Sequence, residues 1–145
     1  MNISKFTQKS IQAVQDLEKI AYEYGNQEIE QEHLLYALLT QEDSLILKLI
    51  EKMEINKEYF INTVKSALDA KVKVSGGELR FGQYLNKALV NAEDEARAMG
   101  DEYVSVEHLF LSLLKQPSPG MKKIFSEFGI TRERFLQALS TVRGN

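Results

Sequence analysis

A stretch of eight residues that occurs twice constrains this sequence more than any other feature. Residues 32–39 begin with Glu-His-Leu and continue as an apolar run, and residues 107–114 do the same 75 positions later (32 to 107). A fixed offset over most of the chain indicates a duplicated unit. Each copy is too short to bury much surface alone, so we predict two similar halves packed into one domain. Further pairs keep the offset: Phe6 and Phe81, Ala21 and Ala96, Gly25 and Gly100, Ile55 and Ile130, and Phe60 and Phe135.

The offset also divides the chain into segments. We predict a first repeat over residues 1–69, a linker over 70–80 and a second repeat over 81–145, which together make one domain of ordinary length. The linker contains Ser75-Gly76-Gly77, and this composition is typical of a polar, flexible connection. Val72 and Val74 alternate with lysines and could form a short extended piece, but the segment is too short to make a sheet.

Apolar residues recur at helical spacing almost throughout, so we predict an all-α fold. Eight helices are expected, four in each half, with the halves related by an approximate two-fold axis. Polar residues that suit N-caps precede the predicted helices, and glycines that suit left-handed ends follow several of them. The predicted helices run from Ser4–Thr7 to Tyr24, from near Gln31 to Leu39, from Leu45 to Met53, from Asn56 to Leu68, from Gly82 to Met99, from Val106 to about Gln116, from Pro119 to Phe128 and from Thr131 to about Val142.

Composition excludes several classes of function. The formal net charge is −3 with acidic and basic residues interspersed, which gives no basic surface for nucleic acid and no cationic face for a membrane. The sequence has no cysteine, so disulfides and thiolate chemistry are excluded. The first residues lack an apolar secretory segment, and no run is long enough to span a bilayer. We therefore expect a cytoplasmic protein.

The only two histidines, His33 and His108, occupy the same place in the two copies. One histidine in each half is a poor metal site, because the adjacent glutamates point in other directions. We expect each histidine to be buried and hydrogen-bonded to backbone near a helix start. No phosphate-binding loop is present, since Gly76-Gly77 stands alone, and nothing suggests a nucleophile. We read the chain as non-catalytic, with no cofactor and no metal of its own.

Glu32 and Glu107 allow two interpretations. Each lies in the first turn of a predicted helix, where the helix dipole favours an anion by about 0.3–1 kcal/mol. Alternatively, each carboxylate faces a groove and pairs with a cationic or amide group of a partner. The residues alone leave both interpretations open.

The arrangement of these motifs resembles the double Clp N-terminal repeat of the ATP-driven Clp and heat-shock unfoldases, over essentially the whole chain. Within that family it looks most like the ClpB type, the protein disaggregases. The ATPase modules and coiled-coil middle domain of the family are missing here. The residues that carry the resemblance are Phe6-Thr7, Gly25-Asn26 and Ile29-Glu30-x-Glu32-His33-Leu34 in the first copy, and Gly100-Asp101 and Val104-Ser105-x-Glu107-His108-Leu109 in the second.

The resemblance implies a substrate-binding accessory domain that engages unfolded or aggregated polypeptides. ATP and magnesium would belong to the absent modules, the isolated domain would be a monomer and the full-length protein a homohexamer. Family residues tied to substrate handling match Thr7, Asp101 and Glu107. The family also has an apolar groove where the halves meet. Leu89 matches a groove position, whereas neighbouring groove positions hold Asn91, Glu95 and His108 here.

Three alternatives compete with this reading. ClpC and ClpA relatives receive adaptor proteins, and ClpC-type domains use glutamates that match Glu32 and Glu107 to bind the guanidinium of phosphoarginine-marked substrates. A small metal-dependent hydrolase would use the two Glu-His pairs. A structural spacer would fill its grooves with its own side chains, since an apolar stripe at helical spacing more often belongs to a core than to a binding site.

Overall fold

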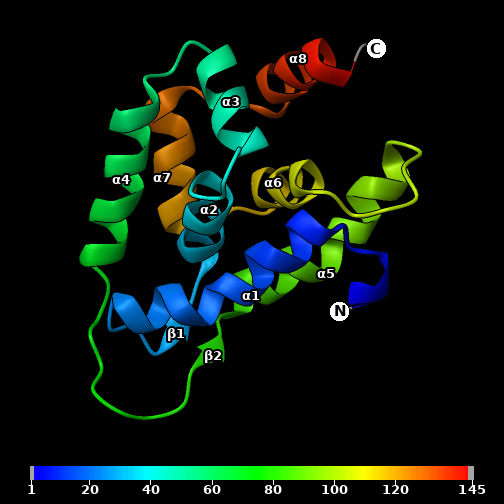
Figure 1. The fold of residues 1–145 in the computed structure, drawn as a ribbon. Coiled ribbons are helices and arrows are strands. Elements are labelled where there is room, and N and C mark those ends of the chain that lie inside the picture. Colours follow the sequence, from blue (N-terminus) through cyan, green and yellow to red (C-terminus); the bar gives the residue numbers. More distant parts are fainter. Residues whose placement is uncertain (1, 144–145) are drawn as a thin grey trace.

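The computed structural model describes residues 2–143, and over these residues the chain forms eight α-helices (Figure 1). The all-α prediction with four helices in each half is therefore confirmed. The helices are α1 (Gln8–Glu23), α2 (Gln31–Leu39), α3 (Leu45–Lys52), α4 (Lys57–Asp69), α5 (Gln83–Ala98), α6 (Val106–Lys115), α7 (Pro119–Phe128) and α8 (Arg132–Arg143).

Short polar side chains start several of these helices. The side-chain oxygen of each of four cap residues accepts a hydrogen bond from a backbone N–H in the first helical turn, which satisfies a donor that the helix itself leaves free. Pro119 is the first residue of α7, where its missing N–H costs nothing. The four cap residues are Thr7, Ser44, Asn56 and Ser118.

The structure selects the later of the two predicted starts of the first helix: Thr7 is the N-cap of α1, and residues Ile3–Lys5 form a short 3-10 helix, η1. The strands differ from the sequence prediction. Val72 and Val74 lie outside regular structure, and the strands are elsewhere: β1 (Glu28–Ile29) pairs in parallel with β2 (Arg80–Phe81). The sequence analysis did not predict these two strands, because a two-residue strand is too short to show an alternation of polar and apolar residues. The predicted boundaries, 1–69, 70–80 and 81–145, stay a prediction.

The backbone repeats along with the sequence. Gly25 and Gly100, which are equivalent, follow the first helix of each copy with φ of 71° and 72°. Glu54 and Gly129 are equivalent too, and both have φ of 63° after the third helix. A left-handed conformation is easy for glycine and strained for a side chain. The duplicated fold therefore imposes the same turn on Glu54 that glycine makes in the second copy.

The two copies exchange short backbone pairings. Ile29 of the first copy pairs with Phe81 of the second, and Val104 of the second pairs with Phe6 of the first. Each partner in the second pairing is the 75-residue equivalent of a partner in the first. The segment that precedes the long helix of one copy thus always lies beside the segment that precedes the second helix of the other.

The hydrogen bonds of these pairings are equivalent as well. The Thr7 N–H donates to the Val104 carbonyl at 3.0 Å, and the Gly82 N–H donates to the Ile29 carbonyl at 2.8 Å. The Val104 N–H also donates to the Lys5 carbonyl at 2.8 Å. This reciprocity gives the approximate two-fold relation that the duplication predicts.

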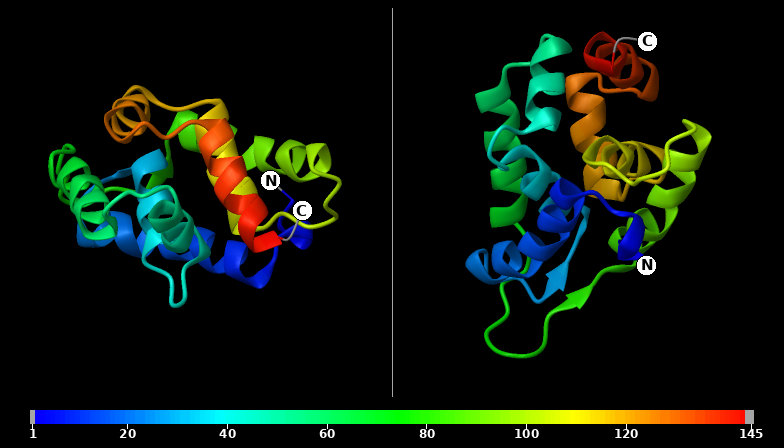
Figure 2. Two further views of the ribbon diagram at one scale, coloured as in Figure 1. Left: turned by 90° about the horizontal axis from the view of Figure 1, so that it is seen from above. Right: turned by 45° about the vertical axis from the view of Figure 1, so that its right-hand side comes forward.

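The second helix of each copy lies at the centre of the molecule (Figures 1 and 2). Helix α1 packs against α2, α5 packs against α6, and α2 and α6 also contact each other. The linker forms an open loop at the foot of the molecule beside β1 and β2. Phe60, Phe110 and Phe135 are among the largest fully buried side chains. No helix in residues 2–143 combines the length and the apolar character that crossing a membrane would need.

One buried amide, that of Gln31, ties the halves together at the start of α2. Its Nε2 donates to the carbonyls of Tyr84 at 3.1 Å and Gln116 at 3.0 Å. Its Oε1 accepts from the backbone N–H of Ser118 at 2.9 Å. A single side chain thus satisfies three backbone groups of the second copy, and none of them has to be buried without a partner.

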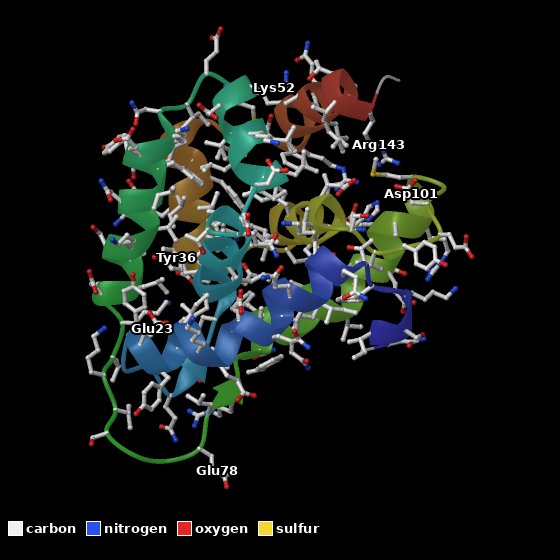
Figure 3. The ribbon with its side chains drawn as sticks, in the orientation of Figure 1. Glu23, Tyr36, Lys52, Glu78, Asp101 and Arg143 are labelled. Atoms are coloured by element: carbon white, nitrogen blue, oxygen red, sulfur yellow. The ribbon has the colours of Figure 1, made fainter. Side chains whose placement is uncertain are left out.

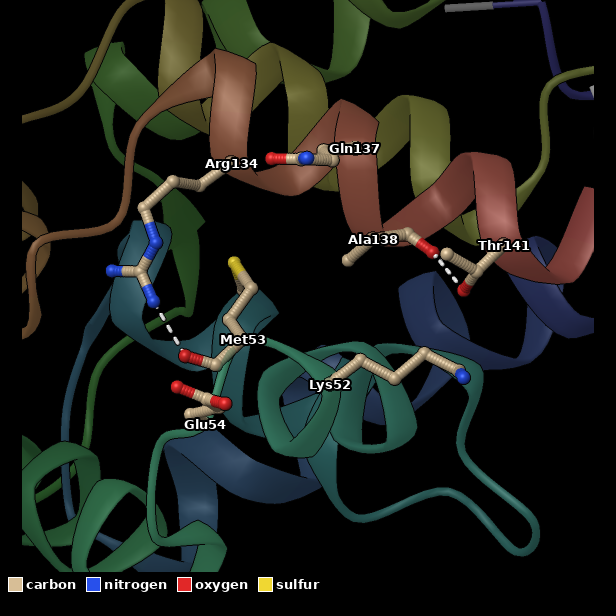
Figure 4. Close-up of a pocket in the computed structure, with 7 residues that line it drawn as sticks. All are labelled: Lys52, Met53, Glu54, Arg134, Gln137, Ala138 and Thr141. Carbon is tan, nitrogen blue, oxygen red and sulfur yellow. Dashed lines mark hydrogen bonds between the residues drawn. The ribbon is translucent and has the colours of Figure 1, made fainter.

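The seam between the halves also has an open groove, where α3 meets α8 (Figure 4). The groove has a volume of about 340 Å³. Arg134 reaches across it and donates to the Met53 carbonyl, and the Met53 side chain points toward α8. The equivalent residue in the first copy is Tyr59, whose hydroxyl donates to Glu127 of α7 at 3.3 Å. The fourth helix of each copy therefore contacts the third helix of the other.

Candidate functional site

The two histidines are twin helix caps. The Nδ1 atom of His33 accepts from the backbone N–H of Glu30 at 2.8 Å, and Nδ1 of His108 accepts from the N–H of Ser105 at the same distance. Both rings are buried. The prediction of buried histidines bonded to backbone at helix starts is confirmed. Each histidine occupies the third helical position, where glutamate or glutamine usually completes a capping box.

The hydrogen-bond partner of the other ring nitrogen, Nε2, differs between the two copies. Because Nδ1 accepts, Nε2 carries the proton and donates: to Asn26 Oδ1 at 2.9 Å in His33 and to Asp101 Oδ2 at 2.8 Å in His108. Burial lowers the pKa of His33 to about 4, and the nearby Lys71 charge adds to this effect. An amide partner cannot stabilise a charged imidazole as a carboxylate would.

Asp101 belongs to a small charged cluster. Its Oδ1 accepts from Arg143 Nη2 at 2.7 Å, and Figure 3 shows the two side chains together at the end of α8. The hydrogen bond from Arg143, followed by that from His108, holds the pKa of Asp101 below its usual range. Arg143 Nη1 also lies 3.8 Å from Oε2 of Glu107. The cluster therefore joins the end of α8 to the start of α6.

Glu32 and Glu107 lie in the first turns of α2 and α6, as predicted from the helix dipole. Both are buried, and each has a cation nearby. Lys71 Nζ lies 3.3 Å from Glu32 Oε2 and 3.1 Å from Glu30 Oε2. The remaining Glu32 oxygen, Oε1, is buried without a hydrogen-bond partner. An unpaired buried carboxylate oxygen is costly, so this atom is a candidate ligand contact.

Glu32 borders a cleft of about 430 Å³ at the seam. The cleft lies between the starts of α2, α5 and α7, and Lys71, Tyr84 and Gly120 contribute to its lining. A Cβ atom at Gly120 would collide with the Glu32 carboxylate. The equivalent of Gly120 in the first copy is Leu45, so the absence of a side chain at this position is particular to the second copy.

Thr7 lies at the corresponding junction in the other half. It caps α1, and its N–H is bonded to Val104, three residues before Glu107. Its equivalent, Gly82, borders the Glu32 cleft. Thr7 thus lies beside the segment that leads from Asp101 to Glu107, where the start of the first copy meets the second copy.

Leu89, predicted to line an apolar groove, is only 1% exposed and belongs to the core. Asn91 Nδ2 donates to Gln116 Oε1 at 2.7 Å, and the buried Glu95 accepts from Arg132 at 2.7 Å. The region is polar and internally bonded, and an open apolar groove at Leu89 is not found among the described residues. Leu89 can meet a client only if this packing opens, and its role stays a prediction.

The model of the family described as the Clp repeat (R) N-terminal domain matches residues 5–128. The chain belongs to this family. The paired Glu-His helix starts and the reciprocal contacts between copies lie almost entirely within the matched range.

Among residues 2–143, no group of three or more histidine, aspartate or glutamate side chains is arranged to hold a metal ion.

Relatives and solved structures agree with this membership. The chaperone protein ClpB of Nitratidesulfovibrio vulgaris is 42% identical over 151 residues, which cover 100% of this chain and 18% of that protein. The chain therefore spans less than a fifth of the length of this relative. The Hsp104 N-terminal domain from Candida albicans superposes with a TM-score of 0.82 at 22% identity, over 97% of this chain and 92% of that one. A ClpV N-domain in complex with a VipB peptide superposes with a TM-score of 0.71 at 19% identity, over 95% and 86%. At these identities the two solved structures show the fold alone.

Several polar residues of the site were missed at the sequence level. Asn26 could have been found, because the offset makes it the equivalent of Asp101 and each stands seven residues before a histidine. Lys71 and Arg143 obey no offset: Lys71 lies two residues after α4, and Arg143 is the last residue of α8. Glu95 looks like a surface residue in sequence, and only its partner Arg132 explains its burial.

The His33 environment predicts a specific loss of stability in acid. The folded-state pKa of about 4 lies below the ordinary value of 6.5, so the unfolded state binds a proton that the folded state does not. Stability should therefore fall as pH drops from about 6.5 to about 4, by roughly 3 kcal/mol at most. An NMR titration of the two imidazoles should find His33 neutral through most of this range.

The second copy supplies the matched variant. Asn26→Asp gives His33 the carboxylate partner that His108 already has, and should raise the pKa of His33 and reduce the acid-induced loss. Denaturant unfolding at pH 7 and pH 4.5 measures the difference. An equal loss in both proteins, or a wild-type His33 that titrates near 6.5, would contradict this account of the twin caps.

Proposed function

We propose that this chain is a client-binding accessory domain of a ClpB-type, ATP-dependent protein disaggregase, and that it engages unfolded or aggregated polypeptides. Family membership and the ClpB relatives support the proposal. A ClpV N-domain of the same fold in complex with a peptide supports it independently. In this proposal the domain is a cytoplasmic monomer without catalytic activity, and ATP hydrolysis belongs to other modules of a homohexamer. Nucleic acid and membranes are not partners.

The observation that carries the proposal is the junction of Thr7, Asp101 and Glu107. Thr7 is far in sequence from Asp101 and Glu107, yet its backbone pairs with Val104, which lies between those two acidic residues. A junction between packed halves is a common place for a peptide to bind. Contact should be weak, because a disordered client loses chain entropy when it binds. Six domains tethered to one ring would raise local capture through effective concentration.

Substitution at this junction should weaken the binding of an unfolded chain. We expect Glu107→Gln and Asp101→Asn each to lower the affinity for reduced and alkylated lactalbumin about fivefold, since a lost polar contact is worth roughly 1 kcal/mol. Fluorescence anisotropy of the labelled client measures this. Thr7→Ser keeps the cap oxygen, whereas Thr7→Ala also removes the cap, so the pair separates client contact from helix stability.

Asp94→Asn provides the control, because it removes an equal charge from an exposed ion pair on α5. The proposal fails if the wild-type domain does not bind the unfolded chain. It also fails if the folded junction variants bind as well as the control.

One observation favours a second function, of the ClpC type. The unpartnered Glu32 Oε1 borders a cleft that also presents Lys71, so a guanidinium and a phosphate each have a partner of opposite charge there. A phosphoarginine-marked substrate carries both groups on one side chain. Adaptor proteins are the other partners of this type.

Free phosphoarginine distinguishes the second function from the first. If it applies, the Glu32 and Gly120 amide signals should shift saturably on titration with phosphoarginine, and Glu32→Gln should abolish the shifts. Gly120→Ala should weaken binding as well, because the methyl group displaces the Glu32 carboxylate. Arginine without phosphate serves as the control ligand. If no saturable shift occurs at millimolar phosphoarginine, this second function is wrong.

A further inference from the structure

Each of the two buried glutamates has one cation beside it, which comes from just after α4 in one case and from the end of α8 in the other. Lys71 stands two residues after the end of α4 and pairs with Glu32. Arg143 is the last residue of α8 and lies beside Glu107. The two cations are not equivalent by the 75-residue offset, so each half has reached the same arrangement with a different residue.

The two cations satisfy the acidic oxygens beside them to different extents. Arg143 donates one N–H to Asp101 at 2.7 Å and directs another nitrogen toward Glu107 at 3.8 Å. The second Asp101 oxygen already accepts from His108. The acidic pair Asp101–Glu107 is thus filled by a guanidinium of the chain itself, whereas the site at Glu32 keeps an oxygen without a partner.

Arg143 is accessible enough to be displaced. Its side chain is 33% exposed and that of Asp101 is 21% exposed, so an incoming group can reach the pair from solvent. An exposed ion pair at a helix end holds its partners weakly. Arginine keeps its charge and offers two parallel donors, which makes another guanidinium the best-matched competitor.

We infer that Arg143 is a resident occupant of the Asp101–Glu107 site, and that a client arginine binds there only by displacing it. The inference rests on the proposed function, because it assigns the selectivity of the same client junction. Arg143 acts as a specificity-determining residue: it rejects neutral and weakly cationic segments and admits those whose guanidinium competes successfully. By linkage, a bound client arginine frees the last turn of α8.

The test uses an apolar peptide with one central arginine, and a matched peptide with citrulline, which has the same shape and no charge. Binding is followed at the Asp101 and Glu107 amides by NMR. Arg143→Gln should bind the arginine peptide about fivefold more tightly than wild type, the factor that corresponds to an exposed ion pair. Affinity for the citrulline peptide should change little. Arg143→Lys keeps the charge without the paired donors and should give a smaller gain.

Lys48→Gln is the control, since it removes the same charge from an exposed ion pair at α3 and should leave peptide affinity unchanged. Amide exchange at Val142 should quicken in wild type on saturation with the arginine peptide. Equal or weaker binding by folded Arg143→Gln overturns the inference, as does an equal gain in Lys48→Gln. If unfolded lactalbumin still binds the wild-type junction in that case, the proposed function stands and only the role of Arg143 fails.

Discussion

The reciprocal backbone pairing between the copies is the constraint on which the rest of the structure depends. The N–H groups of Thr7 and Val104 find their carbonyl partners in opposite copies, and Gly82 repeats the arrangement with Ile29. Backbone donors buried without partners are expensive, so neither half can satisfy its own chain entry alone. Gln31 adds three bonds across the same seam. The duplicated unit is therefore half of one domain, and the hydrogen bonds across the seam are part of what stabilises the fold.

The same pairing fixes the acidic sites. Because the entry segment of one copy lies beside the start of the second helix of the other, the helix N-termini and their glutamates come to the seam. There the two copies have diverged. Asn26 and Asp101 give their histidines different partners, and Gly120 leaves space for the Glu32 carboxylate, whereas its equivalent in the first copy is Leu45. Duplication placed an equivalent glutamate in each copy. Substitutions around them left Glu32 with an oxygen that has no partner, and placed the guanidinium of Arg143 between Asp101 and Glu107.

Sequence periodicity was sufficient for the helices, because apolar spacing, polar caps and glycine ends all act locally. The offset also predicted the two-fold relation and the twin histidine caps. Contacts between distant residues could not be predicted: the β1–β2 pairing involves two residues on each side, and no pattern marks Lys71, just after α4, or Arg143, at the end of α8, as partners of the glutamates. Leu89 was expected in a groove from resemblance and lies in the core, since it belongs to the buried apolar face of α5.

Native-state amide hydrogen exchange tests the central claim most directly. If the copies are halves of one cooperative unit, the amides of Thr7, Gly82 and Val104 should exchange only through global unfolding, with the same free energy as the core of α2 and α6. Denaturant should lower all of these free energies with one common slope. If the junction amides of one copy exchange through a smaller opening while the core helix of the other copy stays protected, the copies are separable and the account is wrong.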